Sequence, residues 1–166
     1  AAQMINFKVA GGTSGHLLGG ALAAILLGPW AGTLVISSVL VVQAFVFQDG
    51  GVMALGANIL NMAVIGVWSG YAIYWVLRKL LPTSKGLWIS GFAAAWFSVV
   101  LAALAAALEL AISGMSPLNV VVPAMGLVHM LIGIGEGLIT TGVLAFLTST
   151  RQDLLEWHAV SVGGVQ

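Results

Sequence analysis

The hydrophobic positions of this chain gather in long runs separated by short polar connections. A helix needs about 20 apolar residues to cross the roughly 30 Å hydrocarbon layer of a membrane. Four runs reach that length: residues 29–47, 52–77, 87–112 and 122–148. A fifth run, residues 16–27, is shorter and is expected either to lie between longer helices or to start deeper in the membrane, and residues 1–7 resemble the end of one more span. The pattern predicts a bundle of about five transmembrane helices plus the end of another.

Composition supports the same fold class. Of the 166 residues, 60% are hydrophobic and 6% are charged, whereas a soluble domain usually carries about 25% charged residues. The mean hydropathy is +1.11. We therefore expect an all-α polytopic membrane protein embedded in the lipid bilayer. The formal net charge is zero, which leaves no basic field for a nucleic acid, and the absence of cysteine excludes disulfides and thiolate metal ligands.

The basic residues indicate an orientation. Arg78, Lys79 and Lys85 cluster in one connection, and Arg151 follows the last apolar run. These positions fall on one side of the membrane if the spans alternate, and the positive-inside rule makes that side cytoplasmic. The segments 8–16, 113–121 and the connection that contains Asp49 are then expected outside the cell, while residues 78–86 and the C-terminal tail are expected inside.

Small residues recur four positions apart in several runs, as in the pairs Gly66 with Gly70 and Gly133 with Gly137. Such pairs let helix backbones approach closely in a bilayer, where apolar burial itself discriminates little. We expect most of them to serve helix packing.

Several polar side chains lie within the apolar runs, where they are costly. His129 and Glu136 are seven residues apart and share one helix face, and Asn58 and Asn61 belong to a similar stripe. Three interpretations stay open for these groups. They form hydrogen bonds between helices, they line a permeation path or support a bound solute, or they translocate protons.

His16 has a different setting from His129. It follows the glycine-rich stretch "GGTSG", where a loop is expected to enter a helix with Ser14 as a candidate cap. The positive end of a helix dipole favours neutral imidazole, which is the form that binds a transition metal. A single histidine does not make a nickel or cobalt site. His16 is therefore either a metal ligand or a capping or packing residue.

Three stretches together resemble a known family. They are "AAQMINFKVAGGTSGHLLGGALAAILLGPW", "DGGVMALGANILNMAVIG" and "HMLIGIGEGLIT", in that order. In combination they are similar to the M subunit of cobalt and nickel energy-coupling-factor transporters, the CbiM/NikM family, in its nickel-type form. The resemblance covers residues 1–155 as one transmembrane domain, and it leaves 156–166 as a cytoplasmic tail or the start of an extension.

The resemblance implies a bundle of about seven helices in a prokaryotic cell membrane. It implies a substrate-binding component that captures Ni(II) or Co(II) outside the cell and passes it to a transmembrane coupling subunit, two ATP-hydrolysing subunits and, in some systems, a small N-type membrane subunit. The family holds its metal with a free N-terminal amine, the amide and imidazole of a second-residue histidine, and a loop histidine. His16 matches that loop histidine. The N-terminal donors belong to an opening segment that this sequence does not contain, so we expect a fragment of a longer chain. Lys8 stands where the family has proline.

Ser14, Asp49, Asn58, His129 and Glu136 are then candidates for supporting a metal site or a pathway, from their expected side of the membrane. No phosphate-binding glycine loop, serine–histidine arrangement or HExxH motif occurs, so we expect neither bound ATP nor an enzyme. A self-contained ion or proton carrier using His129 and Glu136 is the alternative. The choice between nickel and cobalt stays open.

Overall fold

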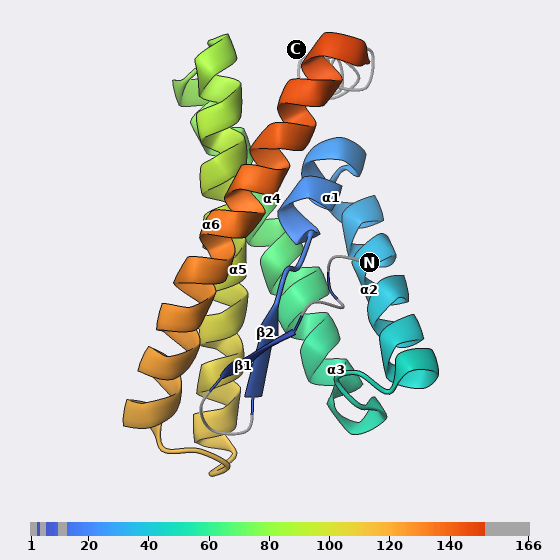
Figure 1. The fold of residues 1–166 in the computed structure, drawn as a ribbon, viewed down its shortest axis with the longest axis vertical. Coiled ribbons are helices and arrows are strands. Elements are labelled where there is room, and N and C mark those ends of the chain that lie inside the picture. The colour runs from blue at the N-terminus through green and yellow to red at the C-terminus, as the bar shows by residue number, and fades with distance from the viewer. Residues whose placement is uncertain (1–2, 4–5, 10–12, 152–166) are drawn as a thin grey trace.

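The computed structural model describes residue 3, residues 6–9 and residues 13–151. Four helices are long and apolar enough to cross a membrane: Pro29–Phe47, Val52–Leu80, Ser84–Ile112 and Leu118–Thr150. The four long spans predicted from the sequence are therefore confirmed, and so is the predicted class of helical membrane protein. Figure 1 shows these helices as a tall bundle with a small strand pair lying against it.

The first long helix combines α2 (Pro29–Val42) with a π-helical turn (Gln43–Phe47). Pro29 occupies the first turn of α2, as its missing N–H group favours. The second begins with a 3-10 turn (Val52–Ala54), continues through α3 (Leu55–Asn58) and a π-helical segment (Ile59–Gly66), and ends as α4 (Val67–Leu80).

The last two helices are the longest. Helix α5 (Ser84–Ile112) begins at Thr83, whose hydroxyl accepts a hydrogen bond from the N–H group of Gly86 at 3.0 Å. Helix α6 (Leu118–Thr150) follows Pro117 and contains Pro123 near its start. Helices α5 and α6 lie beside each other in Figure 1 and pack through small residues.

The beginning of the chain differs from the prediction. Residues 6 and 7 were expected at the end of a span, but Asn6–Val9 forms strand β1, which pairs antiparallel with β2 (Thr13–His16). The expected fifth span is also wrong in its extent. Only Gly20–Leu27 forms a helix, α1, and its eight residues rise about 12 Å, too little to cross the membrane.

The predicted role of Ser14 as a helix cap is also wrong. Ser14 belongs to β2, and α1 begins six residues later with Gly19 at its N-cap and no side-chain cap. Gly19 has a φ of 71°, a left-handed conformation that glycine adopts without strain. Backbone pairing with β1 keeps Thr13–His16 extended, so the helix starts only after the following loop.

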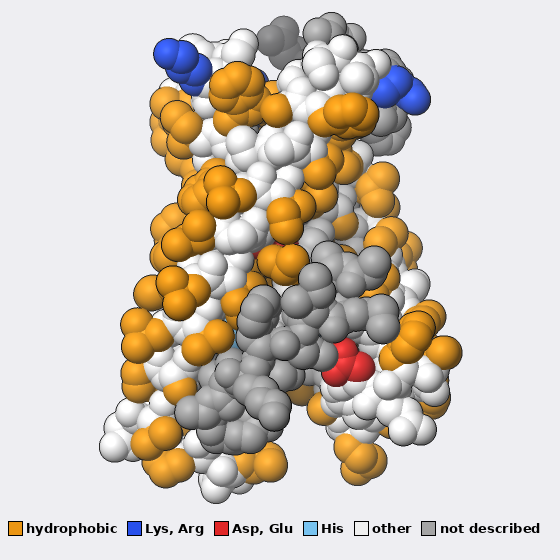
Figure 2. All heavy atoms as spheres, viewed as in Figure 1, with side chains coloured by type: hydrophobic (Ala, Val, Ile, Leu, Met, Phe, Trp, Pro, Cys, Tyr) orange, Lys and Arg blue, Asp and Glu red, His pale blue; other side chains and the backbone are white. Residues whose placement is uncertain are grey.

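The two ends of the bundle differ in charge. Figure 2 shows lysine and arginine side chains at the upper end of the molecule, above flanks covered by hydrophobic side chains. This end carries the α4–α5 connection and the end of α6, with Arg78, Lys79, Lys85 and Arg151. The α2–α3 and α5–α6 connections lie at the opposite end in Figure 1. The α4–α5 connection and the end of α6, which the sequence predicted on the same side of the membrane, therefore lie at the same end of the bundle.

Small residues allow the helices to meet closely, as predicted. A Cβ atom added at Gly70 of α4 would lie 2.8 Å from the Cβ of Ala21 in α1 and 3.2 Å from the Cβ of Ser98 in α5. At Gly133 and Gly137 an added Cβ would meet Trp96 at 2.9 Å and Phe92 at 2.7 Å, both on α5. These glycines set the spacing between helices.

We predict that Gly70→Ala lowers the free energy of unfolding by about 1–3 kcal/mol, because the added methyl group overfills the junction of three helices. The measurement is thermal or denaturant unfolding of the purified protein in detergent. Gly142→Ala on α6 is the matched control, since an added Cβ there meets nothing within 4 Å. Equal stability of the two variants would contradict the close packing at Gly70.

Candidate functional site

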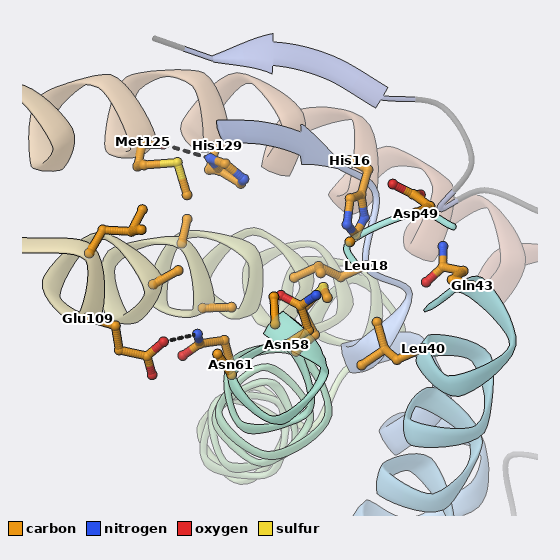
Figure 3. Close-up of a pocket in the computed structure, with 18 of the residues that line it drawn as sticks. His16, Leu18, Leu40, Gln43, Asp49, Asn58, Asn61, Glu109, Met125 and His129 are labelled. Carbon is orange, nitrogen blue, oxygen red and sulfur yellow. Dashed lines mark hydrogen bonds between the residues drawn. The ribbon is translucent and has the colours of Figure 1, made fainter. Parts of the chain in front are cut away.

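A cavity of about 690 Å³ lies among the hairpin and the helices at the end of the bundle opposite the basic residues. Side chains from β2, the end of the first long helix, α3 with its π-helical continuation, α5 and α6 line it. The polar members of this lining are His16, Gln43, Asp49, Asn58, Asn61, Glu109, Ser113 and His129. In Figure 3, His16 and His129 project toward the cavity from one side, while Asn58, Asn61 and Glu109 border it from the other.

His16 is the last residue of β2 and is half-buried in the cavity wall. Its Nδ1 lies 3.0 Å from the carbonyl oxygen of Leu17. A carbonyl only accepts hydrogen bonds, so Nδ1 is the donor in this contact, and in the neutral imidazole Nε2 then carries the lone pair. Histidines that bind metals commonly have one ring nitrogen engaged in this way, with the other directed at the ion.

His129 has a parallel arrangement on α6. Its Nδ1 donates to the carbonyl oxygen of Met125 at 2.8 Å, and the side chain is 6% exposed. Strand β2 lies directly against this histidine. A Cβ added at Gly15 would lie 3.0 Å from the His129 Nε2 and 2.7 Å from the Ile132 side chain. Gly15 therefore permits the hairpin to pack on α6 and places His16 next to the face that carries His129.

Glu136 lies two turns further along α6 and is 3% exposed. It accepts a hydrogen bond from the N–H group of Leu18 at 2.7 Å and another from the N–H group of Gly19. These two groups precede the first residue of α1, where the helix dipole favours a negative charge. Glu136 thus binds the loop between β2 and α1.

Gln3 holds the same loop from another direction. Its side-chain amide donates to the carbonyl oxygen of Leu18 at 2.6 Å, and the side chain is 5% exposed. The backbone of Leu18 is therefore bound through both its N–H and its C=O group. Sequence reasoning did not identify Gln3, because an amide near the start of a chain gives no indication of its partner.

A second polar pair crosses the cavity wall. The Asn61 amide, on the π-helical segment, donates to the Glu109 carboxylate on α5 at 2.8 Å. Asn61 is 4% exposed, whereas Glu109 is half-buried. The sequence put Asn61 in a polar stripe of its helix but did not indicate its contact with Glu109, since 48 residues separate the two.

Of the remaining residues predicted to support a site, two line the cavity. Asp49 and Asn58 line the cavity with His16, and Asn58 approaches the turn at Gly50, where an added Cβ would lie 2.7 Å from its side-chain nitrogen. The Ser14 side chain lies outside the described residues. Gln43, which sequence reasoning missed, also lines the cavity, and its carbonyl oxygen accepts from the Asp49 N–H group at 3.0 Å.

The part of the chain that the structure describes contains no group of three or more histidine, aspartate or glutamate side chains that could hold a metal ion. Nickel and cobalt sites need several donors. Within the described residues His16 and His129 are instead individual imidazoles, each with its Nδ1 bonded to a backbone carbonyl.

Comparison with known proteins identifies the family. A family described as "Cobalt uptake substrate-specific transmembrane region" matches residues 1–154. The chain belongs to this CbiM family. Family membership, together with the four apolar helices, makes the chain a multi-pass membrane protein.

Relatives within and around the family carry both metals in their names. The chain is 38% identical over 168 residues to the fused nickel transport protein NikMN of Rhodobacter capsulatus. This match covers 92% of this chain and 48% of that protein. It is 36% identical over 151 residues to the cobalt transport protein CbiM of Sorangium cellulosum. This match covers 87% of this chain and 66% of that protein. The chain spans about half the length of the fused nickel transport relatives that it matches.

The fold is also known from experiment. A crystal structure of a transition metal transporter is similar with a TM-score of 0.84 and 34% sequence identity, over 98% of this chain and 77% of that chain. The fold described above is therefore similar to that of solved transition metal transporters.

We predict that Asn61→Ala lowers the free energy of unfolding by about 1 kcal/mol, because it removes the amide that donates to the Glu109 carboxylate. A double-mutant cycle with Glu109→Ala measures the coupling directly. Asn61→Ala should lower the free energy of unfolding more in the wild-type background than in the Glu109→Ala background, and the same should hold for Glu109→Ala in the reverse comparison. Fully additive costs would contradict an energetic link between the two side chains.

Proposed function

We propose that this chain is the substrate-binding membrane component of an energy-coupling-factor importer for Ni(II) or Co(II). It captures the ion at the outer face and delivers it for ATP-driven uptake. The position of His16 in the cavity wall is the main support for this function. In a chain of the cobalt-uptake family, its Nε2 lone pair lies in the wall of a cavity at the end of the bundle opposite the basic residues.

The chemistry of His16 fits a borderline transition metal. Imidazole suits nickel and cobalt, and the hydrogen bond from Nδ1 to the Leu17 carbonyl holds the ring with Nε2 as the donor atom. His16 supplies one ligand. The further nitrogen donors implied by the family resemblance belong to an N-terminal segment that would enter the cavity beside it. Asp49, Asn58 and His129 line the same cavity and are placed to support bound ligands or waters by hydrogen bonds.

The partners follow from the same proposal. The sequence has no phosphate-binding glycine loop, so ATP hydrolysis is assigned to two ATPase subunits, coupled through a transmembrane subunit and, in some systems, a small N-type subunit. The protein is placed in the cell membrane of a prokaryote. The end with Arg78, Lys79, Lys85 and Arg151 faces the cytoplasm, and the cavity end faces outward.

A self-contained carrier based on His129 and Glu136 has less support. Glu136 already accepts two backbone hydrogen bonds, and the Nδ1 of His129 is bound to its own helix. Metal accumulation in vesicles that requires the ATPase subunits would favour the importer, and proton-coupled flux by the chain alone would favour the carrier.

We predict that His16→Ala in the full-length protein, with its native N-terminus, lowers Ni(II) affinity by about 100-fold or more. Changes to outer-shell groups alone cost about 10–100-fold, and this change removes a ligand. Isothermal titration of metal-free protein measures the effect. His158→Ala, which alters a histidine of the expected cytoplasmic tail, is the matched control and should bind as the unaltered protein does. Retained tight binding by His16→Ala would overturn the proposed ligand.

We also predict the orientation from cysteine labelling, which is simple because the chain has no cysteine. Met115→Cys lies at the cavity end, and Lys85→Cys lies at the start of α5 at the opposite end. A membrane-impermeant maleimide added to intact cells should label Met115→Cys. It should label Lys85→Cys only after the membrane is opened. The reverse pattern would contradict the proposed orientation.

A further inference from the structure

Glu136 and His16 are joined through a single peptide group. The N–H group of Leu18 and the C=O group of Leu17 are the two ends of one planar peptide unit. Glu136 accepts from that N–H at 2.7 Å, and the Nδ1 of His16 donates to that C=O at 3.0 Å. The atoms form a continuous series: carboxylate, peptide N–H, peptide C=O, imidazole Nδ1–H and finally imidazole Nε2.

This series resembles a known arrangement at metal sites, in which a carboxylate binds one nitrogen of a histidine whose other nitrogen ligates the ion. Here a peptide group lies between the carboxylate and the ring. Hydrogen bonds in series polarise one another, so the carboxylate on the N–H end makes the C=O end a stronger acceptor. A stronger acceptor at Nδ1–H fixes the tautomer of His16 and makes Nε2 a better electron donor.

The next peptide group, between Leu18 and Gly19, is bound at both of its ends. Glu136 also accepts from the N–H group of Gly19, and Gln3 donates to the C=O group of Leu18 at 2.6 Å. Both side chains are at least nine-tenths buried, with 3% of Glu136 and 5% of Gln3 exposed. The Leu17–Leu18 peptide group, bound at its own N–H by Glu136, is therefore followed by a peptide group that is also fixed against α6.

We propose that Glu136 is a positioning residue for metal capture, acting on His16 through the Leu17–Leu18 peptide group to set which ring nitrogen faces the ion and how strongly it binds. The inference rests on the proposed function, in which His16 is a ligand. It makes α6 responsible for the donor strength of a histidine that lies 120 positions earlier in the chain.

The decisive test compares two substitutions whose order depends on the mechanism. Glu136→Gln preserves size and shape but loses the negative charge, whereas Glu136→Asp keeps the carboxylate and loses a methylene group. If charge acts through the peptide group, Glu136→Gln should lower Ni(II) affinity by about 10- to 100-fold and Glu136→Asp should lower it less. If Glu136 only fills space, the order should reverse, and that result would overturn the proposal.

A second readout needs no metal. Nitrogen-15 NMR of histidine-labelled, metal-free, full-length protein should show His16 protonated at Nδ1, and Glu136→Gln should give a mixture of the two tautomers. Thr140→Val, one turn further along the same buried face of α6, is the control and should leave the His16 signals and the affinity unchanged. An unchanged tautomer in Glu136→Gln would overturn the proposal.

A backbone variant covers the case in which Glu136→Gln fails to fold. Replacing the Leu18 amide with an ester removes the N–H group and leaves Glu136 intact, and it should reproduce the affinity loss. Wild-type affinity in the ester variant would overturn the role of the peptide group. If His16→Ala itself retains tight Ni(II) binding, the proposed function fails. If His16→Ala loses Ni(II) binding but Glu136→Gln and the ester variant bind as the wild type does, the proposed function stands and this inference fails.

Discussion

The Glu136 carboxylate is the contact on which the candidate site depends. Backbone N–H and C=O groups inside a membrane must find partners within the protein, so irregular backbone is tolerated there only where side chains or neighbouring segments bind it. The loop between β2 and α1 is such a segment. Glu136 binds the N–H groups of Leu18 and Gly19, and Gln3 binds the Leu18 carbonyl. These bonds allow a strand pair and an eight-residue helix to lie among long helices.

Helix α6 therefore does more than cross the membrane. Its inner face meets β2 at His129 and Ile132, where Gly15 leaves room for both side chains, and it binds the following loop at Glu136. Next to this face, Gly133 and Gly137 allow α5 to approach. One helix thus holds both His16 and the segment that supports it. This arrangement explains why polar residues and glycines recur among the apolar residues of the "HMLIGIGEGLIT" stretch.

The sequence predicted the long helices well because span length and hydropathy are properties of contiguous residues. The inward face of His129 and Glu136 was also predictable from helical spacing, and both are buried. The partners of Glu136 were not predictable, because they are backbone N–H groups, which almost every residue carries. For the same reason the β1–β2 pairing was missed, and His16 was placed at the start of a helix rather than at the end of a strand. The Asn61–Glu109 bond joins side chains on two different helices, a contact that spacing along either helix does not reveal.

We propose that a loop bound to α6 presents the Nε2 atom of His16 to the transported ion. The measurement that distinguishes this arrangement from others is a crystal structure of the full-length protein loaded with Ni(II), with anomalous data collected at the nickel absorption edge. We expect an anomalous peak within bonding distance of the His16 Nε2, with Nδ1 still donating to the Leu17 carbonyl and Glu136 still bound to Leu18. A peak at Nδ1, or one in the cavity away from His16, would contradict it.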